Sequence, residues 1–240
     1  MGIRRGSILT PIIADGLVFN IDPANRASYP KTGTIITDTI GNITGTLNGA
    51  SGDNNTPQWE NINGGIFDFD GSDDYIILSL DGTGGASSNF NSGTDLEFTI
   101  SFWFNRGSSS IRIGLFQWSN TLTSLSPFLL IQQNNDNLSA YYDGGYRSIA
   151  STSQDIWYHI TITRTASDNT LRGYLNGSEL LSYDDGGTPI LQNTTTSVYF
   201  GNGYQNYFNG NIANSQIYNR ALSASEVLHN YNALKSRFGL

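Results

Sequence analysis

The sequence contains no cysteine, and only two of its 240 residues are lysine. No disulfide can therefore stabilise the fold, and a chain of this length buries enough surface to need none. With a formal net charge of -8, the chain has too few cations for a surface that follows nucleic acid phosphates. We therefore expect no nucleic acid partner.

Long apolar runs are also absent, so no segment predicts insertion into a membrane. The N-terminus has arginines before apolar residues, as an export signal would, but Pro11 and Asp15 interrupt this stretch. We interpret residues 1–14 as an ordered arm that docks on other subunits, and residues 15–240 as one domain. The arm residues expected to make these contacts are Arg4, Arg5, Ile8, Leu9, Ile12 and Ile13.

Residues for catalysis are scarce as well. The chain has two histidines, His159 and His229, which together with the missing cysteine gives little support for a nucleophilic triad or a zinc site. The four glutamates are far apart in sequence, at Glu60, Glu97, Glu179 and Glu226. We expect no enzymatic activity and name no catalytic residue.

The residues that are present predict many short strands. Runs rich in Ile, Phe, Tyr, Trp and Thr recur between clusters of Gly, Asn, Asp and Ser. Alternation at Phe98, Ile100, Phe102 and Phe104 predicts one face buried against a second sheet. The clearest strands are predicted at residues 66–69, 75–80, 96–104, 111–118, 128–132, 157–164, 171–175, 198–200 and 212–218.

One tight hairpin is specified by sequence. Asn176 and Gly177 stand between two apolar runs, and both residue types tolerate the positive φ angles of a type I′ turn. The pattern predicts antiparallel strands on either side of this pair.

A single helix is predicted at residues 223–237. Ser223 and Glu226 have the spacing of a capping box, and Leu222 can pack on Val227 ahead of the first turn. We expect the helix to lie against the sandwich through one apolar stripe, formed by Val227, Leu228, Tyr231 and Leu234.

Four segments together resemble the laminin G-like branch of the concanavalin A-like lectin and glucanase superfamily. They are residues 67–76 (FDFDGSDDYI), 98–104 (FTISFWF), 157–164 (WYHITITR) with 174–177 (YLNG), and 208–212 (FNGNI) continuing into 217–223 (IYNRALS). The resemblance implies an all-β fold, a two-sheet antiparallel jelly-roll sandwich with a short C-terminal helix. Glucanases of this superfamily place two glutamates on one strand, and that arrangement is missing here.

The two ends of the chain resemble a narrower group of proteins within this superfamily. Residues 16–22, 27–30, 218–227 and 237–240 are similar to virion structural proteins of tailed phages, especially marine and cyanobacterial ones. This implies a non-enzymatic virion component, either a capsid decoration protein or part of a tail or fibre. Its partners would be other virion proteins in a homo-oligomer or symmetric assembly. The alternative is a secreted or fibre-borne lectin module that recognises host-surface carbohydrate.

Calcium is the one candidate cofactor that the sequence suggests. Asp68, Asp70, Asp73 and Asp74 could supply carboxylate oxygens, and the resemblance implies that such an ion is frequent. The alternative is a polar turn in which aspartate bonds to nearby backbone groups. We favour the turn and expect no cofactor, with calcium (Ca2+) kept as the alternative.

Aromatic residues in Gly-rich and Asn-rich segments are the candidates for ligand or partner binding. Each ring offers a large apolar surface with a polar handle. The candidate residues are Tyr142, Tyr146, Arg147, Tyr204 and Tyr207, with Tyr141 and Phe208 in the same segments. The alternative, slightly favoured, is that several of them cap the ends of the core.

Overall fold

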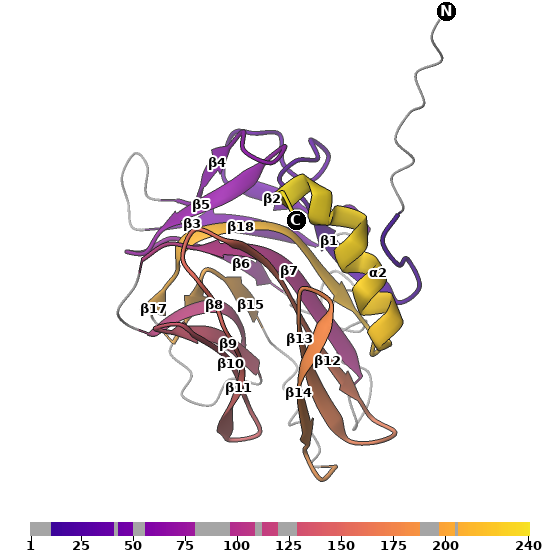
Figure 1. Cartoon of the computed structure of the whole chain (residues 1–240). Coiled ribbons are helices and arrows are strands. Elements are labelled where there is room, and N and C mark those ends of the chain that lie inside the picture. The colour runs from indigo at the N-terminus through magenta and orange to yellow at the C-terminus, as the bar shows by residue number, and fades with distance from the viewer. Residues whose placement is uncertain are drawn as a thin grey trace, which may run out of the picture.

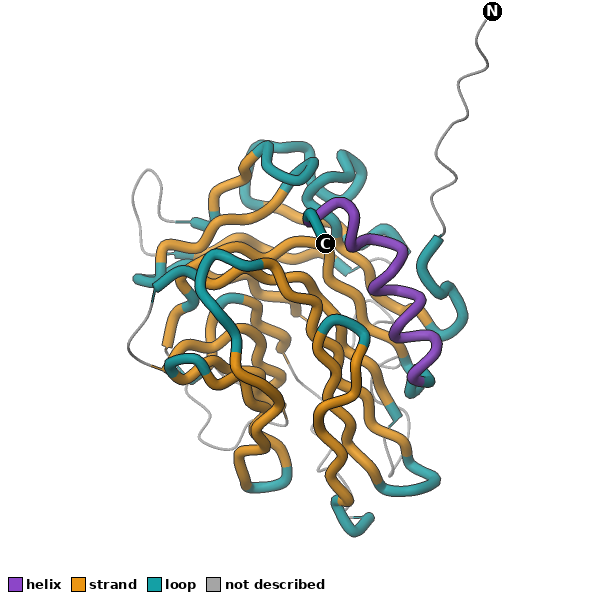
Figure 2. The backbone as a smooth tube through the Cα atoms, in the orientation of Figure 1, coloured by secondary structure: helices purple, strands orange, loops and turns teal. Residues whose placement is uncertain are grey.

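Two antiparallel sheets packed face to face form the body of the chain (Figure 1). This computed structural model describes residues 11–40, 43–49, 56–79, 97–108, 112–119, 129–187, 197–204 and 206–240. Figure 2 shows strands over most of the described body, with the helix along one side. The predicted all-β sandwich with a short C-terminal helix is confirmed.

The first sheet runs from β14 at one edge to β4 at the other. Its order is β14 (Ser178–Asp184), β13 (Thr170–Leu175), β12 (Trp157–Thr165), β7 (Phe98–Arg106), β18 (Asn209–Tyr218), β5 (Ile66–Asp70) and β4 (Gln58–Glu60). β1 (Leu17–Ile21) pairs with the far end of β18. The central strands β7 and β18 come from opposite halves of the chain, so this sheet forms only when both halves are present.

The second sheet contains eight strands. Its order is β11 (Gly145–Ser151), β10 (Asn137–Tyr142), β9 (Leu129–Asn134), β8 (Arg112–Ser119), β15 (Ser197–Phe200), β6 (Tyr75–Ser79), β3 (Thr44–Asn48) and β2 (Ile35–Thr37). A separate small hairpin joins β16 (Asn202–Gly203) to β17 (Asn206–Tyr207).

Phenylalanines fill the space between the two sheets. The alternating side chains of β7 predicted to face a core are fully buried, and Phe102 lies edge-on to Phe200 at 5.8 Å and stacks on Phe116 at 6.3 Å. Phe116 and Phe200 belong to neighbouring strands of the second sheet. The alternation on β7 therefore fixes which face of the first sheet meets the second.

The Asn176–Gly177 turn is as predicted. Asn176 has φ 52° and Gly177 has φ 80°, the positive angles that a type I′ turn requires. A Cβ at Gly177 would lie 2.9 Å from Leu228 Cδ1, so the turn also packs on the C-terminal helix. Glycine is needed there for both its backbone angle and its lack of a side chain.

The predicted C-terminal helix consists of α2 (Ala224–Leu234) and a 3-10 turn, η1 (Lys235–Phe238). The Ser223 hydroxyl accepts from the backbone N–H of Glu226, and the Glu226 carboxylate accepts from the backbone N–H of Ser223, which confirms the capping box. Leu222 and Val227 are buried in one cluster, as the predicted packing requires.

The prediction that Leu228 belongs to the buried stripe is wrong. Leu228 is 46% exposed, whereas Asn230 is buried. Asn230 donates from Nδ2 to the Tyr218 hydroxyl at 2.9 Å and accepts from the Ile13 N–H at 2.8 Å. The helix therefore buries the hydrogen-bonding side chain of Asn230, whereas hydropathy alone predicts that Leu228 is buried.

The C-terminal segment covers part of the outer face of the first sheet (Figure 1). Phe238 stacks on Trp103 with ring centroids 4.2 Å apart, and Tyr231 stacks on the same indole at 5.7 Å. Arg237 anchors the end of the chain through an ion pair with Asp22, with Nη1 and Oδ2 2.8 Å apart. Among the described residues, no helix covers the outer face of the second sheet. None of the described helices is long and apolar enough to span a membrane.

The predicted arm divides into two parts. Arg4, Arg5, Ile8 and Leu9 lie outside the described residues. The backbone of residues 11–13 is bound to the chain's own helix and sheet, since His229 Nε2 donates to the Pro11 carbonyl and the Tyr218 hydroxyl donates to the Ile13 carbonyl. Ile12 is half-buried, and Ile13 packs against the cluster around Val227. Docking on another subunit therefore stays a prediction for the residues before Pro11.

Candidate functional site

The outer face of the second sheet carries most of the predicted aromatic candidates. On β10, Leu138, Ala140 and Tyr142 point into the core. Tyr141 therefore points outward, because successive side chains of a strand alternate between faces. On β6, Ile76 and Leu78 point into the core in the same way, which places Tyr75 outward.

Strand register aligns several outward side chains in one row across the sheet. Tyr146 pairs with Tyr141, Tyr141 with Leu130, Leu130 with Gln117, and Gln117 with Tyr199. The row crosses four gaps between strands, so it is about 19 Å long at the usual strand spacing. A tyrosine stands at each end of this row.

The β16–β17 hairpin covers the middle of the row. A Cβ at Gly203 would lie 2.3 Å from Leu130 Cδ1, so the hairpin backbone packs directly on that leucine. The Tyr204 N–H at the hairpin turn donates to Gln117 Oε1 at 2.6 Å. Leu130 and Gln117 are consequently buried, and the exposed part of the face is divided into two tyrosine clusters.

The first cluster contains Tyr141, Tyr146 and Arg112, and we name it the edge cluster. The Tyr141 and Tyr146 rings meet edge to face at 4.9 Å. The Arg112 guanidinium lies 4.7 Å from the Tyr146 ring centroid, and its Nη1 donates to the Tyr146 hydroxyl at 2.8 Å. Tyr146 is still 48% exposed, so a ring held in place on two sides remains accessible.

The second cluster contains Tyr75, Tyr199 and Tyr207, with Tyr204 nearby at the turn of the hairpin. The Tyr75 ring lies 6.3 Å from Tyr199 and 6.5 Å from Tyr207. Tyr199 is buried beneath this group, while Tyr204 is 43% exposed. The cluster supports the hairpin, and Tyr204 is its most exposed neighbour. The backbone of Tyr204 is in the left-handed region, with φ 54°.

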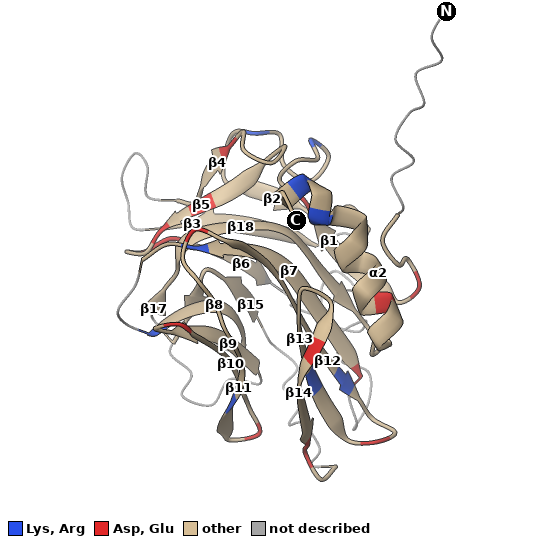
Figure 3. Cartoon of the chain, in the orientation of Figure 1, with Lys and Arg blue, Asp and Glu red and all other residues tan. Residues whose placement is uncertain are grey.

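The segment from Asp70 to Asp74 forms the predicted polar turn between β5 and β6. The Ser72 N–H donates to Asp70 Oδ1 at 2.7 Å, and the Asp70 N–H donates to Asp74 Oδ2 at 3.0 Å. Figure 3 shows the acidic positions on β5 and at its end. Burial raises the pKa of Asp74 to about 7, with further contributions from the charges of Asp70, Asp73 and Asp68.

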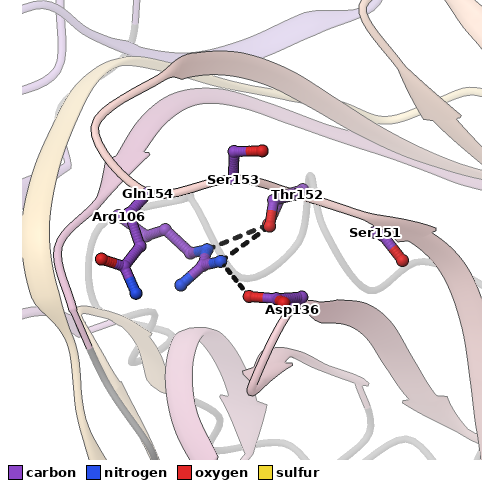
Figure 4. A pocket seen from close by; sticks show the side chains of 6 residues that line it. All are labelled: Arg106, Asp136, Ser151, Thr152, Ser153 and Gln154. Atoms are coloured by element: carbon purple, nitrogen blue, oxygen red, sulfur yellow. Dashed lines mark hydrogen bonds and ion pairs between the residues drawn. The ribbon is translucent and has the colours of Figure 1, made fainter.

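A polar pocket of about 400 Å³ lies between the end of β7, the β9–β10 turn and the segment that follows β11 (Figure 4). It is lined by Arg106, Asp136, Ser151, Thr152, Ser153 and Gln154. The buried Arg106 guanidinium donates from Nη2 to Asp136 Oδ1 at 2.5 Å and to the Thr152 carbonyl at 2.7 Å. Arg106 thus joins the β9–β10 turn to the segment after β11, which is a structural role, and the pocket has no aromatic wall.

Comparison with known proteins now identifies the fold family. A family model described as the concanavalin A-like lectin/glucanases superfamily (Laminin_G_3) matches residues 70–228. The chain belongs to this family. None of the curated proteins matches it.

Two of the solved structures with the same fold match more than nine-tenths of this chain. A Trypanosoma rangeli sialidase in complex with the inhibitor DANA has a TM-score of 0.68 at 16% identity, covering 94% of this chain and 35% of the sialidase. The receptor binding domain of botulinum neurotoxin C/D mosaic serotype has a TM-score of 0.66 at 18% identity, covering 92% of this chain and 52% of that domain. The laminin G-like chain therefore spans between about a third and a half of these structures, and the likeness shows the fold alone.

One predicted binding residue of this laminin G-like domain is not at the surface. Tyr142 is 2% exposed, and its hydroxyl donates to Asp185 Oδ2 at 2.9 Å. The interpretation of Tyr142 as a surface ligand residue is therefore wrong, because strand alternation turns it inward and its neighbour Tyr141 outward. Tyr141 belongs to the candidate site in its place.

Among the other predicted residues, Tyr146, Tyr204 and Tyr207 lie on the outer face, in two different clusters. Arg147 points the other way, with its guanidinium 3.8 Å from the Tyr183 ring centroid on the facing edge strand β14. The structure thus separates the five predicted positions. Arg112, which sequence reasoning did not select, belongs to the edge cluster, and its outward direction follows from Ile113 lying in the core.

Tyr142 instead belongs to a charged network inside the laminin G-like sandwich. The Arg164 Nε donates to Asp185 Oδ2 at 2.7 Å, and both side chains are fully buried. Burial alone would raise the pKa of Asp185, but hydrogen bonds from Arg164 and Tyr142 hold it below its usual range. The network links β12 of the first sheet to β10 of the second, so its role is to join the sheets.

The glutamates stay apart in the folded domain. Glu60 lies on β4, Glu97 precedes β7, Glu179 lies on β14, and Glu226 lies in α2 beside Arg220. Hydrogen bonds from Arg220 lower the pKa of Glu226 to about 2. No two of the four glutamates therefore share one strand, which is the arrangement of the family's glucanases.

His159 is buried in the first sheet. Its Nε2 is 2.7 Å from Ser101 Oγ, and its ring lies 4.8 Å from that of Trp103. Burial lowers the pKa of His159 to about 3, so the imidazole is neutral at physiological pH. The contacts with Ser101 and Trp103 give His159 a structural role in the first sheet.

Proposed function

We propose that this laminin G-like domain is a non-catalytic module that binds carbohydrate through the edge cluster of Tyr141, Tyr146 and Arg112. The observation that carries the proposal is the Tyr146 ring, held by Tyr141 and Arg112 yet 48% exposed. A ring fixed before binding loses little conformational entropy when a ligand covers it.

The chemistry of the cluster suits a sugar. The apolar face of a tyrosine ring can cover the C–H face of a pyranose, while polar groups around the ring bond to hydroxyls. Arg112 supplies donors beside the ring, and the Ser148 hydroxyl lies on the same outer face of β11. The cluster lies at the sheet edge, where a ligand reaches it without moving the hairpin.

The fold family supports a binding role. The proteins of similar fold include a receptor binding domain and a sialidase, of which this chain covers about half and a third. No two of the four glutamates share one strand, which favours binding over hydrolysis by a pair of glutamates.

A glycan array with the purified chain tests the proposal, followed by calorimetry on each glycan retained. Tyr146→Ala should weaken the affinity by about tenfold or more, a loss of about 1.4 kcal/mol. Tyr146→Phe should keep most of it, because the ring remains. The matched control is Ile62→Ala, a 51% exposed apolar residue in the loop between β4 and β5. Equal affinities for Tyr146→Ala and Ile62→Ala would place any binding elsewhere.

An assembly role in a phage virion is the second candidate, and it stays a prediction. It is supported by the resemblance of the two chain ends to virion proteins of tailed phages, and by the two arginines before Pro11 in an acidic chain. Deletion of residues 1–10 should leave the melting temperature nearly unchanged and abolish oligomerisation or incorporation. Sedimentation of the full and shortened chains measures this, and equal assembly of both would contradict the docking role of the arm.

A further inference from the structure

The edge strand β11 carries a line of outward side chains that begins at Tyr146. Ser148 lies two residues further along the strand, so it points to the same face as Tyr146, and it is exposed. Its hydroxyl donates to Asn137 Oδ1 at 3.0 Å, and Asn137 is exposed as well. A polar line therefore leads away from the ring on which the proposed function depends.

A β-bulge keeps this line on the outer face up to the end of the strand. The register of β10 and β11 shifts between Leu138 and Ser139, which leaves Ile149 as an extra residue on β11. Leu138 pairs with Ala150, and both pack on the core. The next residue, Ser151, therefore points outward, and it is exposed. Without the bulge, strict alternation would turn this serine inward.

The line ends at the polar pocket, because Ser151 is one of the residues that line it. Arg106 is 1% exposed, and it uses Nε and Nη2 to bond to Thr152 and Asp136. Figure 4 shows no bond from its third nitrogen, Nη1, to the other lining residues. The Asp136 side chain is 74% exposed, and Gln154 is exposed too. The pocket thus offers both donors and acceptors to a ligand.

These polar groups suit an uncharged sugar residue. A guanidinium donor beside a carboxylate acceptor matches a pair of adjacent hydroxyls, because each hydroxyl can both donate and accept. A carboxylate on the ligand would instead lie beside Asp136, in a chain with a formal net charge of -8. The volume of about 400 Å³ has room for more than a single hydroxyl group.

The distance between the two ends of the line sets the size of a ligand that reaches both. Tyr146 and Ser151 lie on one strand, and their separation in sequence corresponds to about 16 Å at about 3.3 Å per residue. A monosaccharide or disaccharide on the Tyr146 ring is too short to reach the pocket. Only a longer chain can contact the edge cluster and the pocket together.

We propose that the carbohydrate ligand is a linear oligosaccharide of neutral sugars that extends along β11 from Tyr146 to the pocket at Arg106. This inference rests on the proposed function of the edge cluster. Arg112 lies in the same cross-strand row as Ser151, and its Nη1 donates to the Tyr146 hydroxyl. Its guanidinium therefore supplies donors between the two ends of the ligand.

Calorimetric titration with a series from the disaccharide to the hexasaccharide of the array-selected glycan tests this inference. Affinity should rise by about tenfold along the series, because the longer chains add contacts in the pocket. The double variant Ser153→Ala with Gln154→Ala removes two exposed polar side chains of the pocket. It should abolish this rise and leave the affinity for the disaccharide unchanged. The matched control is Ser182→Ala, at an exposed serine on β14.

Amide chemical shifts measured by NMR give a second readout. The amides of residues 151–154 should shift with the hexasaccharide and stay unchanged with the disaccharide. Hexasaccharide affinity that is equal in the double variant and in Ser182→Ala, or unshifted amides at residues 151–154, would overturn the inference.

The variant Tyr146→Ala separates failure of this inference from failure of the proposed function. An affinity that does not depend on chain length but is weakened by Tyr146→Ala would overturn the extended ligand and keep the edge cluster as a sugar site. Binding of no glycan in the series would overturn both proposals.

Discussion

The buried pair of Arg164 and Asp185 gives the sharpest prediction about stability. Both side chains are fully buried, and Tyr142 of the second sheet donates to the same carboxylate. Asp185→Asn keeps the shape of the side chain and removes its charge, so the buried guanidinium of Arg164 loses the ion pair with Asp185. Breaking one side of a buried ion pair typically costs about 3 to 5 kcal/mol.

This loss corresponds to a measurable change in melting temperature. The unfolding entropy is about 2.1 cal/mol/K per residue, or about 0.5 kcal/mol/K for a chain of 240 residues. Asp185→Asn should therefore lower the melting temperature by about 6 to 10 °C. Urea unfolding followed by tryptophan fluorescence should show the same loss, with an unchanged dependence on denaturant.

Two control variants distinguish the loss of stability from breaking this ion pair from a general effect of changing the net charge. Asp184→Asn changes the adjacent exposed residue and should alter stability by less than about 0.5 kcal/mol. Arg164→Met combined with Asp185→Leu removes both charges and should be more stable than Asp185→Asn alone. If Asp185→Asn costs no more than Asp184→Asn, the pair does not hold the two sheets together.

Three further perturbations test other parts of the fold. Glu226 has a pKa lowered to about 2, so its ion pair with Arg220 stabilises the native state above about pH 4.5 and is lost as pH falls towards 2. Glu226→Gln should flatten the stability profile over this interval in urea titrations at several pH values. Gly177→Ala should cost about 1 kcal/mol or more, because a Cβ there meets Leu228 at φ 80°, and differential scanning calorimetry measures the loss. Phe238→Ala removes the ring stacked on Trp103 and should cost about 3 to 5 kcal/mol by chemical denaturation.

Local signals in the sequence predicted the parts of the fold that local chemistry controls. The Asn176–Gly177 turn needs positive φ angles, and the Ser223–Glu226 box needs only a spacing of three residues. The strand at β7 was recognisable because its phenylalanines alternate. By contrast, β2, β3 and β4 are short and carry few aromatic residues, so their pairing depends on contacts made by other strands.

Long-range contacts explain most of the errors at the candidate site. Tyr141 and Tyr142 are adjacent, and only the inward positions of Leu138 and Ala140 determine which of them reaches the surface. Arg164 and Asp185 are 21 residues apart, with no motif to link them. Asn230 is buried, and it bonds to Ile13, which is 217 positions away in the sequence, and to Tyr218 on β18. Helical periodicity cannot predict such contacts.

Calorimetric titration with an array-selected glycan, comparing the unmodified chain with Tyr146→Ala, tests the central claim most directly. The account predicts saturable binding by the unmodified chain, a loss of about tenfold or more in Tyr146→Ala, and near-normal affinity in Tyr146→Phe. Saturable binding that Tyr146→Ala leaves unchanged, or no glycan retained at millimolar concentration, would contradict the assignment of the edge cluster as a carbohydrate site.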